Sequence, residues 1–128
     1  MKKIFLIHDE QENPASRASF LEMAGYQVEL MQSADECLQR IGNETPDVVI
    51  MDALLQGRTG FELCRQLRMT YGPEQLPIIL MSLIYRGRTF REEAMSCGAQ
   101  HYFLRPMKLD ELALAVNLLT GNLGGAAA

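Results

Sequence analysis

The chain has 128 residues, of which 48% are hydrophobic, and this length and composition are typical of one globular domain. Its net charge of −4 argues against direct binding to nucleic acid, because phosphate backbones require a basic surface. No apolar run is long enough for a membrane span or a signal-peptide core, so the sequence predicts a cytoplasmic protein. Cys37, Cys64 and Cys97 lack the spacing of a zinc site, and we expect buried, reduced thiols.

Short apolar runs alternate with amphipathic segments along the chain. The first, third and fourth runs are apolar without alternation, as in parallel strands that are covered on both faces. The second run alternates more, as expected of a strand at the edge of a sheet. The predicted strands are residues 3–7, 27–31, 47–51, 77–81 and 101–104.

The segments between these runs carry helix signals. Asn13 and Pro14 match an N-cap followed by proline at the first helical position. Capping boxes, in which Ser or Thr precedes Glu by three residues, predict further helix starts at Ser33, Thr59 and Thr89. The last helix is predicted for residues 109–119. The helices are expected to end near Gly25, Gly42, Gly98 and Gly121.

This order is β-α repeated five times, which predicts an α/β fold with right-handed crossovers. We expect a doubly wound, five-stranded parallel sheet between two helix layers, a (βα)5 three-layer sandwich with the flavodoxin-like strand order 2-1-3-4-5. Residues 1–121 are predicted to form this domain. The low-complexity residues 122–128 are interpreted as a linker stub or an expression remnant.

Polar residues follow the predicted strands where the carboxyl ends of a parallel sheet form sites. Asp9 follows the first strand, Asp52 the third, Ser82 the fourth and Arg105 the fifth. Two neighbouring carboxylates suit Mg²⁺, which prefers oxygen ligands. A carboxylate can attack a phosphoryl group, and a metal ion, a hydroxyl and a cation can stabilise that transfer. Asp52, on the central strand, is the predicted nucleophile.

Several segments carry a family resemblance in the expected order. PDVVIMDALLQGRTGFELCRQLR (46–68), LPIILMS (76–82) and CGAQHYFLRPMKLDEL (97–112) resemble the phosphoacceptor segment, the fourth strand, and the fifth strand with the last helix of response-regulator receiver domains. The resemblance covers roughly residues 3–120 and is to a single domain of the kind found in chemotaxis regulators. Such domains act in two-component signalling.

The resemblance implies a role for each residue at the strand ends. Asp52 matches the phosphoacceptor and Asp9 the main metal ligand, and the backbone carbonyl of Leu54 matches a further ligand to Mg²⁺. Ser82 takes the position of the switch hydroxyl that contacts the phosphoryl group. Tyr102 takes that of the aromatic switch residue, whose ring turns inward when the hydroxyl moves.

The sequence also departs from the family pattern around this site. His8 stands where the family has a first acid, and we expect it to contact the metal weakly, through water. Arg105 replaces a lysine, and Leu83 replaces a small residue beside the phosphorylation site. Gln56 stands where proline is common, although Gln56-Gly57 still predicts a loop. We therefore expect weakened Mg²⁺ binding and slow phosphorylation or an unusual phosphoryl lifetime.

The resemblance implies a phosphorelay module that receives its phosphoryl group from a histidine kinase or a histidine phosphotransfer protein. Any catalysis would be self-phosphorylation and dephosphorylation, and a metabolic enzyme is not expected. Output is expected through the face formed by the helix after Thr89, the strand 101–104 and the last helix. The basic residues Arg86, Arg88 and Arg91 border that face, and a homodimer is left open.

Two other functions remain alternatives. A pseudo-receiver would bind its protein partner without phosphorylation, which the departures at His8, Leu83 and Arg105 favour. A flavin or nucleotide enzyme on the same fold would need a Gly- or Ser-rich phosphate loop after the first strand, whereas HDEQEN (8–13) is acidic and lacks glycine.

Overall fold

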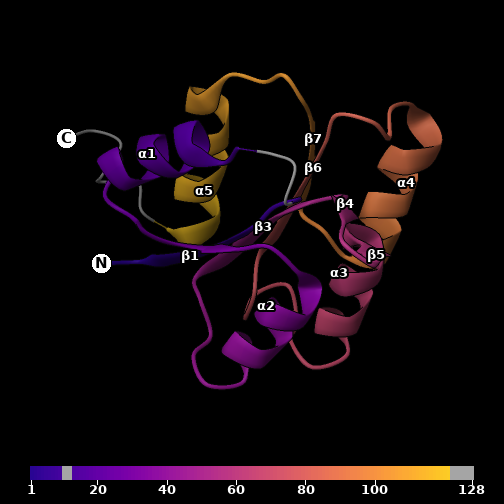
Figure 1. The fold of residues 1–128 in the computed structure, drawn as a ribbon, viewed down its shortest axis with the longest axis horizontal. Coiled ribbons are helices and arrows are strands. Elements are labelled where there is room, and N and C mark those ends of the chain that lie inside the picture. The colour runs from indigo at the N-terminus through magenta and orange to yellow at the C-terminus, as the bar shows by residue number, and fades with distance from the viewer. Residues whose placement is uncertain (10–12, 122–128) are drawn as a thin grey trace.

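The computed structural model describes residues 1–9 and 13–121, and these form an α/β sandwich (Figure 1). Five parallel strands form one sheet in the order β2-β1-β3-β6-β7, which is the predicted order 2-1-3-4-5. The edge strand β2 is partly exposed, as its alternating pattern predicted. The strands of the sheet are β1 (Lys3–Ile7), β2 (Gln27–Met31), β3 (Val48–Asp52), β6 (Ile78–Ser82) and β7 (His101–Leu104).

Helices cover both faces of the sheet (Figure 1). α1 and α5 lie side by side on one face, and α2, α3 and α4 cover the other. The two faces have separate apolar cores, which is why the central residues of β1, β3 and β6 are apolar on both faces of the sheet. The helices are α1 (Ala15–Met23), α2 (Ala34–Ile41), α3 (Gly60–Arg68), α4 (Arg88–Cys97) and α5 (Leu109–Thr120).

Two of the predicted capping boxes begin helices. The hydroxyl of Ser33 accepts from the backbone N–H of Glu36 at 3.1 Å, and that of Thr59 accepts from Glu62 at 3.2 Å. The prediction at Thr89 was wrong. Gly87, with φ of 106°, turns the chain into α4 two residues earlier, so Thr89 lies inside the first turn.

The loop after β3 contains a short hairpin that the sequence pattern did not predict. β4 (Leu54–Leu55) pairs antiparallel with β5 (Arg58–Thr59) across the turn at Gln56-Gly57. Gly57 has φ of 83°, a value that glycine adopts without strain. The hairpin joins the end of β3 directly to the first turn of α3.

The remaining predictions from composition concern thiols and membranes. The three cysteines are buried and free, as predicted. In residues 1–9 and 13–121, no helix combines the length and apolar character needed to cross a membrane.

Candidate functional site

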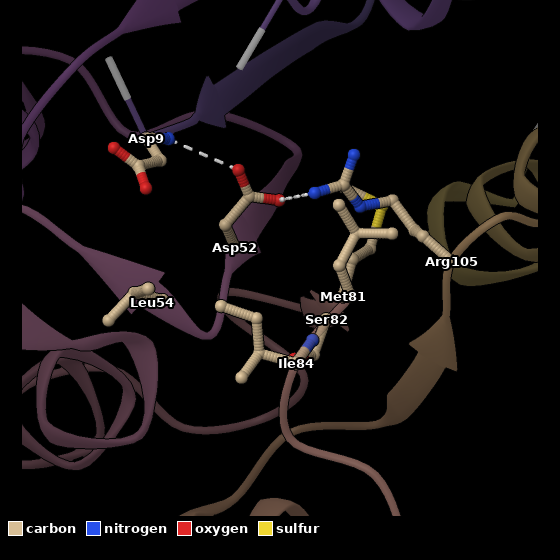
Figure 2. A pocket seen from close by; sticks show the side chains of 8 residues that line it. Asp9, Asp52, Leu54, Met81, Ser82, Ile84 and Arg105 are labelled. Carbon is tan, nitrogen blue, oxygen red and sulfur yellow. Dashed lines mark hydrogen bonds and ion pairs between the residues drawn. The ribbon is translucent and has the colours of Figure 1, made fainter. Parts of the chain in front are cut away.

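The carboxyl ends of the parallel strands bring the predicted residues together. Asp9, Asp52, Ser82 and Arg105 line one cavity of about 30 Å³ (Figure 2). A water molecule needs about 10–15 Å³ measured in this way, so the cavity accommodates about two small species. The cavity is completed by Leu54, Met81, Leu83 and Ile84.

Asp52 lies at the centre of this site and is only 2% exposed. It is the last residue of β3, and its neighbours in the sheet are the ends of β1 and β6. Its Oδ2 accepts a hydrogen bond from the backbone N–H of Asp9 at 3.1 Å. The guanidinium of Arg105 approaches the other oxygen, with Nη2 3.7 Å from Oδ1. Figure 2 shows Asp9 and Arg105 on opposite sides of the carboxylate.

A second arginine, Arg17, also approaches Asp52, and the sequence reasoning did not identify it. Its Nη2 lies 4.0 Å from Oδ2 of Asp52. Arg17 belongs to the buried side of α1, together with Ala18 and Leu21. An arginine four residues before a buried leucine, on the apolar side of a helix, was the available signal. A buried guanidinium requires an anionic or polar partner, so such a position indicates a site.

Ser82 holds the chain that follows β6. Its Oγ accepts from the backbone N–H groups of Ile84 at 3.1 Å and Tyr85 at 2.8 Å. Tyr102 is buried with its ring turned into the protein, and its hydroxyl donates to the carbonyl oxygen of Tyr85. Burial raises the pKa of this phenol, although a hydrogen bond with Ser82 partly opposes the shift. Ser82 and Tyr102 therefore both bind the backbone of Tyr85, at its N–H and at its carbonyl oxygen, and their switch roles stay predictions.

His8 is buried beside the site but does not line the cavity. Its Nδ1 lies 3.0 Å from the carbonyl oxygen of Asp9, which can only accept, so Nδ1 carries the proton in this contact. Its predicted contact with a metal through water stays a prediction. Leu83, which replaces a small residue of the family pattern, lines the cavity and is 45% exposed.

The residues at the cavity provide a sparse set of oxygen ligands for a metal ion. Within residues 1–9 and 13–121, no group of three or more His, Cys, Asp or Glu side chains could hold a metal ion. The carboxylates of Asp9 and Asp52 and the residue Leu54 line one cavity, however. Mg²⁺ commonly binds through one or two carboxylates and keeps several water ligands, so this donor set fits Mg²⁺. Two guanidinium groups beside Asp52 oppose any cation there.

Comparison with known proteins shows the family of this chain. The family model "Response regulator receiver domain" matches residues 4–117. The chain is 32% identical over 120 residues to the phosphate regulon transcriptional regulatory protein PhoB of Rhizobium meliloti, covering 93% of this chain and 52% of that protein. It is 32% identical over 117 residues to the response regulator MprA of Mycobacterium sp. (strain KMS), covering 91% and 50%. The chain therefore spans about half the length of these curated relatives.

Solved structures agree with the sequence comparison. A signal receiver domain of a signal transduction histidine kinase from Syntrophus aciditrophicus superposes with a TM-score of 0.82 at 26% identity, covering 96% of this chain and 92% of that one. The Francisella response regulator 1452 receiver domain has the same fold, with a TM-score of 0.85 at 22% identity and coverage of 95% and 98%. The arrangement of Asp9, Asp52 and Ser82 at the strand ends and the match over nearly the whole domain lead to one conclusion: this chain belongs to the response regulator receiver domain family of two-component signalling.

Proposed function

We propose that this receiver domain accepts a phosphoryl group on Asp52 from a phosphorylated histidine of a kinase or phosphotransfer protein. One observation carries the proposal. Asp52 is an almost fully buried carboxylate at the end of the central strand, and it faces a cavity that it shares with Asp9, Ser82 and Arg105. A buried acid with a hydrogen-bond donor on one oxygen and a cation near the other is held in place for attack.

In the proposed reaction a carboxylate oxygen of Asp52 attacks the phosphorus atom of the phosphohistidine. A P–O bond forms to Asp52, the P–N bond to the imidazole breaks, and the leaving nitrogen keeps the bonding electron pair. The phosphoryl oxygens carry the negative charge through this transfer. Arg105 is placed to neutralise part of that charge, because its guanidinium already faces Oδ1.

Asp9, Asp52 and the backbone carbonyl of Leu54 are the proposed ligands of Mg²⁺. When bound, the ion supplies charge neutralisation and orientation for the phosphoryl oxygens. Asp9 also donates its backbone N–H to Asp52, so the same residue would hold both the metal ion and the nucleophile. Ser82 is proposed to donate its hydroxyl hydrogen to the phosphoryl group, and any movement of the side chain towards that group would loosen the hydrogen bonds that its Oγ accepts from Ile84 and Tyr85.

Output is proposed through the face that α4, β7 and α5 share. A broad hollow on this face combines apolar side chains with charged residues of both signs, Arg91, Lys108 and Glu111. Movement of Ser82 would disturb Tyr85, whose carbonyl accepts from Tyr102 on β7, and Tyr102 also lines the hollow. This chain of contacts links Asp52 to a surface. Either a cytoplasmic protein partner or a second copy of the domain is proposed to bind there.

The test is intact mass after incubation with acetyl phosphate and Mg²⁺. We expect an adduct of one phosphoryl group that hydroxylamine removes and that is absent from Asp52→Ala. Circular dichroism of the variant checks that it is folded. Absence of the adduct from the folded wild-type protein, together with partner binding that Asp52→Ala leaves unchanged, would instead support a phosphorylation-independent pseudo-receiver.

A further inference from the structure

Arg17 brings a second guanidinium to Asp52, from a helix near the start of the chain. It lies on α1, is 7% exposed, and has Nη2 4.0 Å from Oδ2 of Asp52. Arg105, after β7, approaches Oδ1 instead. The carboxylate therefore has one cation near each of its oxygens, and both cations are largely buried.

Both guanidinium contacts with the carboxylate are ion pairs rather than short hydrogen bonds. Their distances of 3.7 and 4.0 Å exceed the usual limit of about 3.2 Å. A phosphoryl group on one carboxylate oxygen of Asp52 would add three further oxygens as acceptors for the N–H groups of Arg17 and Arg105. Arginine binds phosphate oxygens through parallel N–H groups, so the two side chains are positioned for the phosphorylated form.

A second cavity supports the same arrangement. It has a volume of about 300 Å³ and is lined by both guanidinium-bearing residues, Arg17 and Arg105. Leu83 and Arg105 line this cavity and the site at Asp52, so the two hollows adjoin. The other walls are apolar, which strengthens the attraction of the two cations for an anion. These walls are Leu83, Pro106, Met107 and Leu109.

The charges at Asp52 have opposite consequences for a metal ion and for an oxyanion. Arg17 and Arg105 place two positive charges beside the carboxylate of Asp52 before any ligand binds. A cation that enters this site meets repulsion from both guanidinium groups, whereas an oxyanion meets attraction from them.

From these contacts we infer that Arg17 is a second phosphoryl-binding residue, which with Arg105 forms a two-arginine oxyanion site at Asp52 and weakens Mg²⁺ binding before phosphorylation. The inference rests on the proposed phosphorylation of Asp52. It adds a residue of α1 to the site and predicts that part of the neutralisation usually left to the metal ion is supplied by the protein.

The test measures two ligands by isothermal titration calorimetry on wild type, Arg17→Gln and Arg17→Lys. The first ligand is Mg²⁺ alone, and the second is beryllium fluoride, a phosphoryl mimic, at saturating Mg²⁺. Arg17→Gln should bind Mg²⁺ about tenfold more tightly and beryllium fluoride about tenfold more weakly, since one charge is removed from the site. Arg17→Lys should fall between wild type and Arg17→Gln for both ligands.

Arg40→Gln is the matched control, because it removes one positive charge from α2, where Arg40 is half-exposed and pairs with Glu29. It should bind both ligands as wild type does. Weaker binding of both ligands by Arg17→Gln would show a merely structural role, as would unchanged binding, and either result overturns the inference. If Arg17→Gln melts below the assay temperature, Arg17→Lys is the deciding variant. It should then bind Mg²⁺ more tightly and beryllium fluoride more weakly than wild type does. Failure of wild type to bind beryllium fluoride at all would contradict the phosphorylation of Asp52 itself, which is a separate outcome.

Discussion

Gly60 packs directly against the main chain of Asp52. A Cβ atom at Gly60 would lie 2.5 Å from the carbonyl oxygen of Asp52 and 3.1 Å from Cα of Ala53. The N–H of Gly60 also donates to the carbonyl of Ala53 at 2.6 Å. The first turn of α3 is thereby fixed against the residue that we propose as the phosphoacceptor.

Gly60→Ala should therefore displace Asp52 and destabilise the domain by about 1–3 kcal/mol, because backbone atoms must move to admit the methyl group. Urea denaturation measures the loss. Gly42→Ala is the control, since Gly42 has helical dihedral angles and its nearest contact is 3.8 Å away. That change should be neutral or stabilising by about 0.5 kcal/mol. Equal effects of the two substitutions would contradict the close contact at Asp52.

Arg68 ties the end of α3 to two connections that lead into the sheet. Its guanidinium donates to the carbonyl oxygens of Leu76 at 2.6 Å and Gly98 at 2.9 Å, and to Oε1 of Gln100 at 3.0 Å. Arg68→Met keeps much of the apolar stem but removes the hydrogen bonds that the guanidinium donates to these acceptors. We expect a loss of about 2–4 kcal/mol in the free energy of unfolding, measured in urea.

Arg65 provides the comparison for Arg68. It lies on the same helix but is exposed, where it pairs with Glu93. Exposed ion pairs contribute about 0–1 kcal/mol, so Arg65→Met should change stability little. If Arg65→Met costs as much as Arg68→Met, the hydrogen bonds of Arg68 are not the source of its effect.

The pKa of Cys37 predicts how stability depends on alkaline pH. Burial, and to a smaller extent the charge of Glu36, raises the pKa of this thiol from 9.0 to about 12. The contribution of the buried, protonated thiol to the free energy of unfolding is complete below pH 9. It is lost as pH rises from 9 towards 12, because the thiol of the unfolded chain ionises first. Relative to Cys37→Ala, the wild-type protein should lose about 2–4 kcal/mol over that range. Urea denaturation at pH 8 and pH 11 measures the difference, and parallel losses in both proteins would refute it.

Arg105 should contribute to phosphorylation through its positive charge. Arg105→Met is expected to slow adduct formation with acetyl phosphate about a hundredfold, because a preorganised cation at the transferring group is lost. Arg105→Lys retains that charge and should stay within about tenfold of wild type. Initial rates from intact mass measure both, and Arg40→Gln controls for net charge. Identical rates for Lys and Met at this position would show that charge is not its contribution.

The fold was predictable because each central strand is a continuous apolar run. Five β-α repeats whose strands are covered on both faces predict a parallel sheet between two layers of helices. The polar residues that follow those strands then converge at the carboxyl end of the sheet. Strands β3 and β6 each begin and end one residue later than predicted, so that they end at Asp52 and Ser82. Pairing with the neighbouring strand sets the last residue of each strand, since Asp52 lies opposite Met81 and Ser82 lies opposite Leu104. Such long-range pairing is not visible in a local pattern.

The parts that were missed depend on tertiary contacts or on weak local signals. Thr89 carries a capping sequence, but Gly87 can adopt a positive φ and begins the helix first. Arg17 looks like an ordinary surface arginine until α1 is placed against the site. The need for glycine at position 60 arises only because α3 approaches the backbone of Asp52. His8 was noticed as a departure, yet the sequence could not indicate that its ring would face the Asp9 carbonyl.

The site at Asp52 draws its residues from separate segments: the end of β1, helix α1, and the ends of β3, β6 and β7. No single segment of the chain holds a binding-competent fragment, so ligand affinity belongs to the fully folded state alone. By mass action, an occupant at one hundred times its dissociation constant would add about 2.7 kcal/mol to the free energy of unfolding. Occupancy would then slow local opening across the whole sheet, and amide hydrogen exchange far from Asp52 would report it.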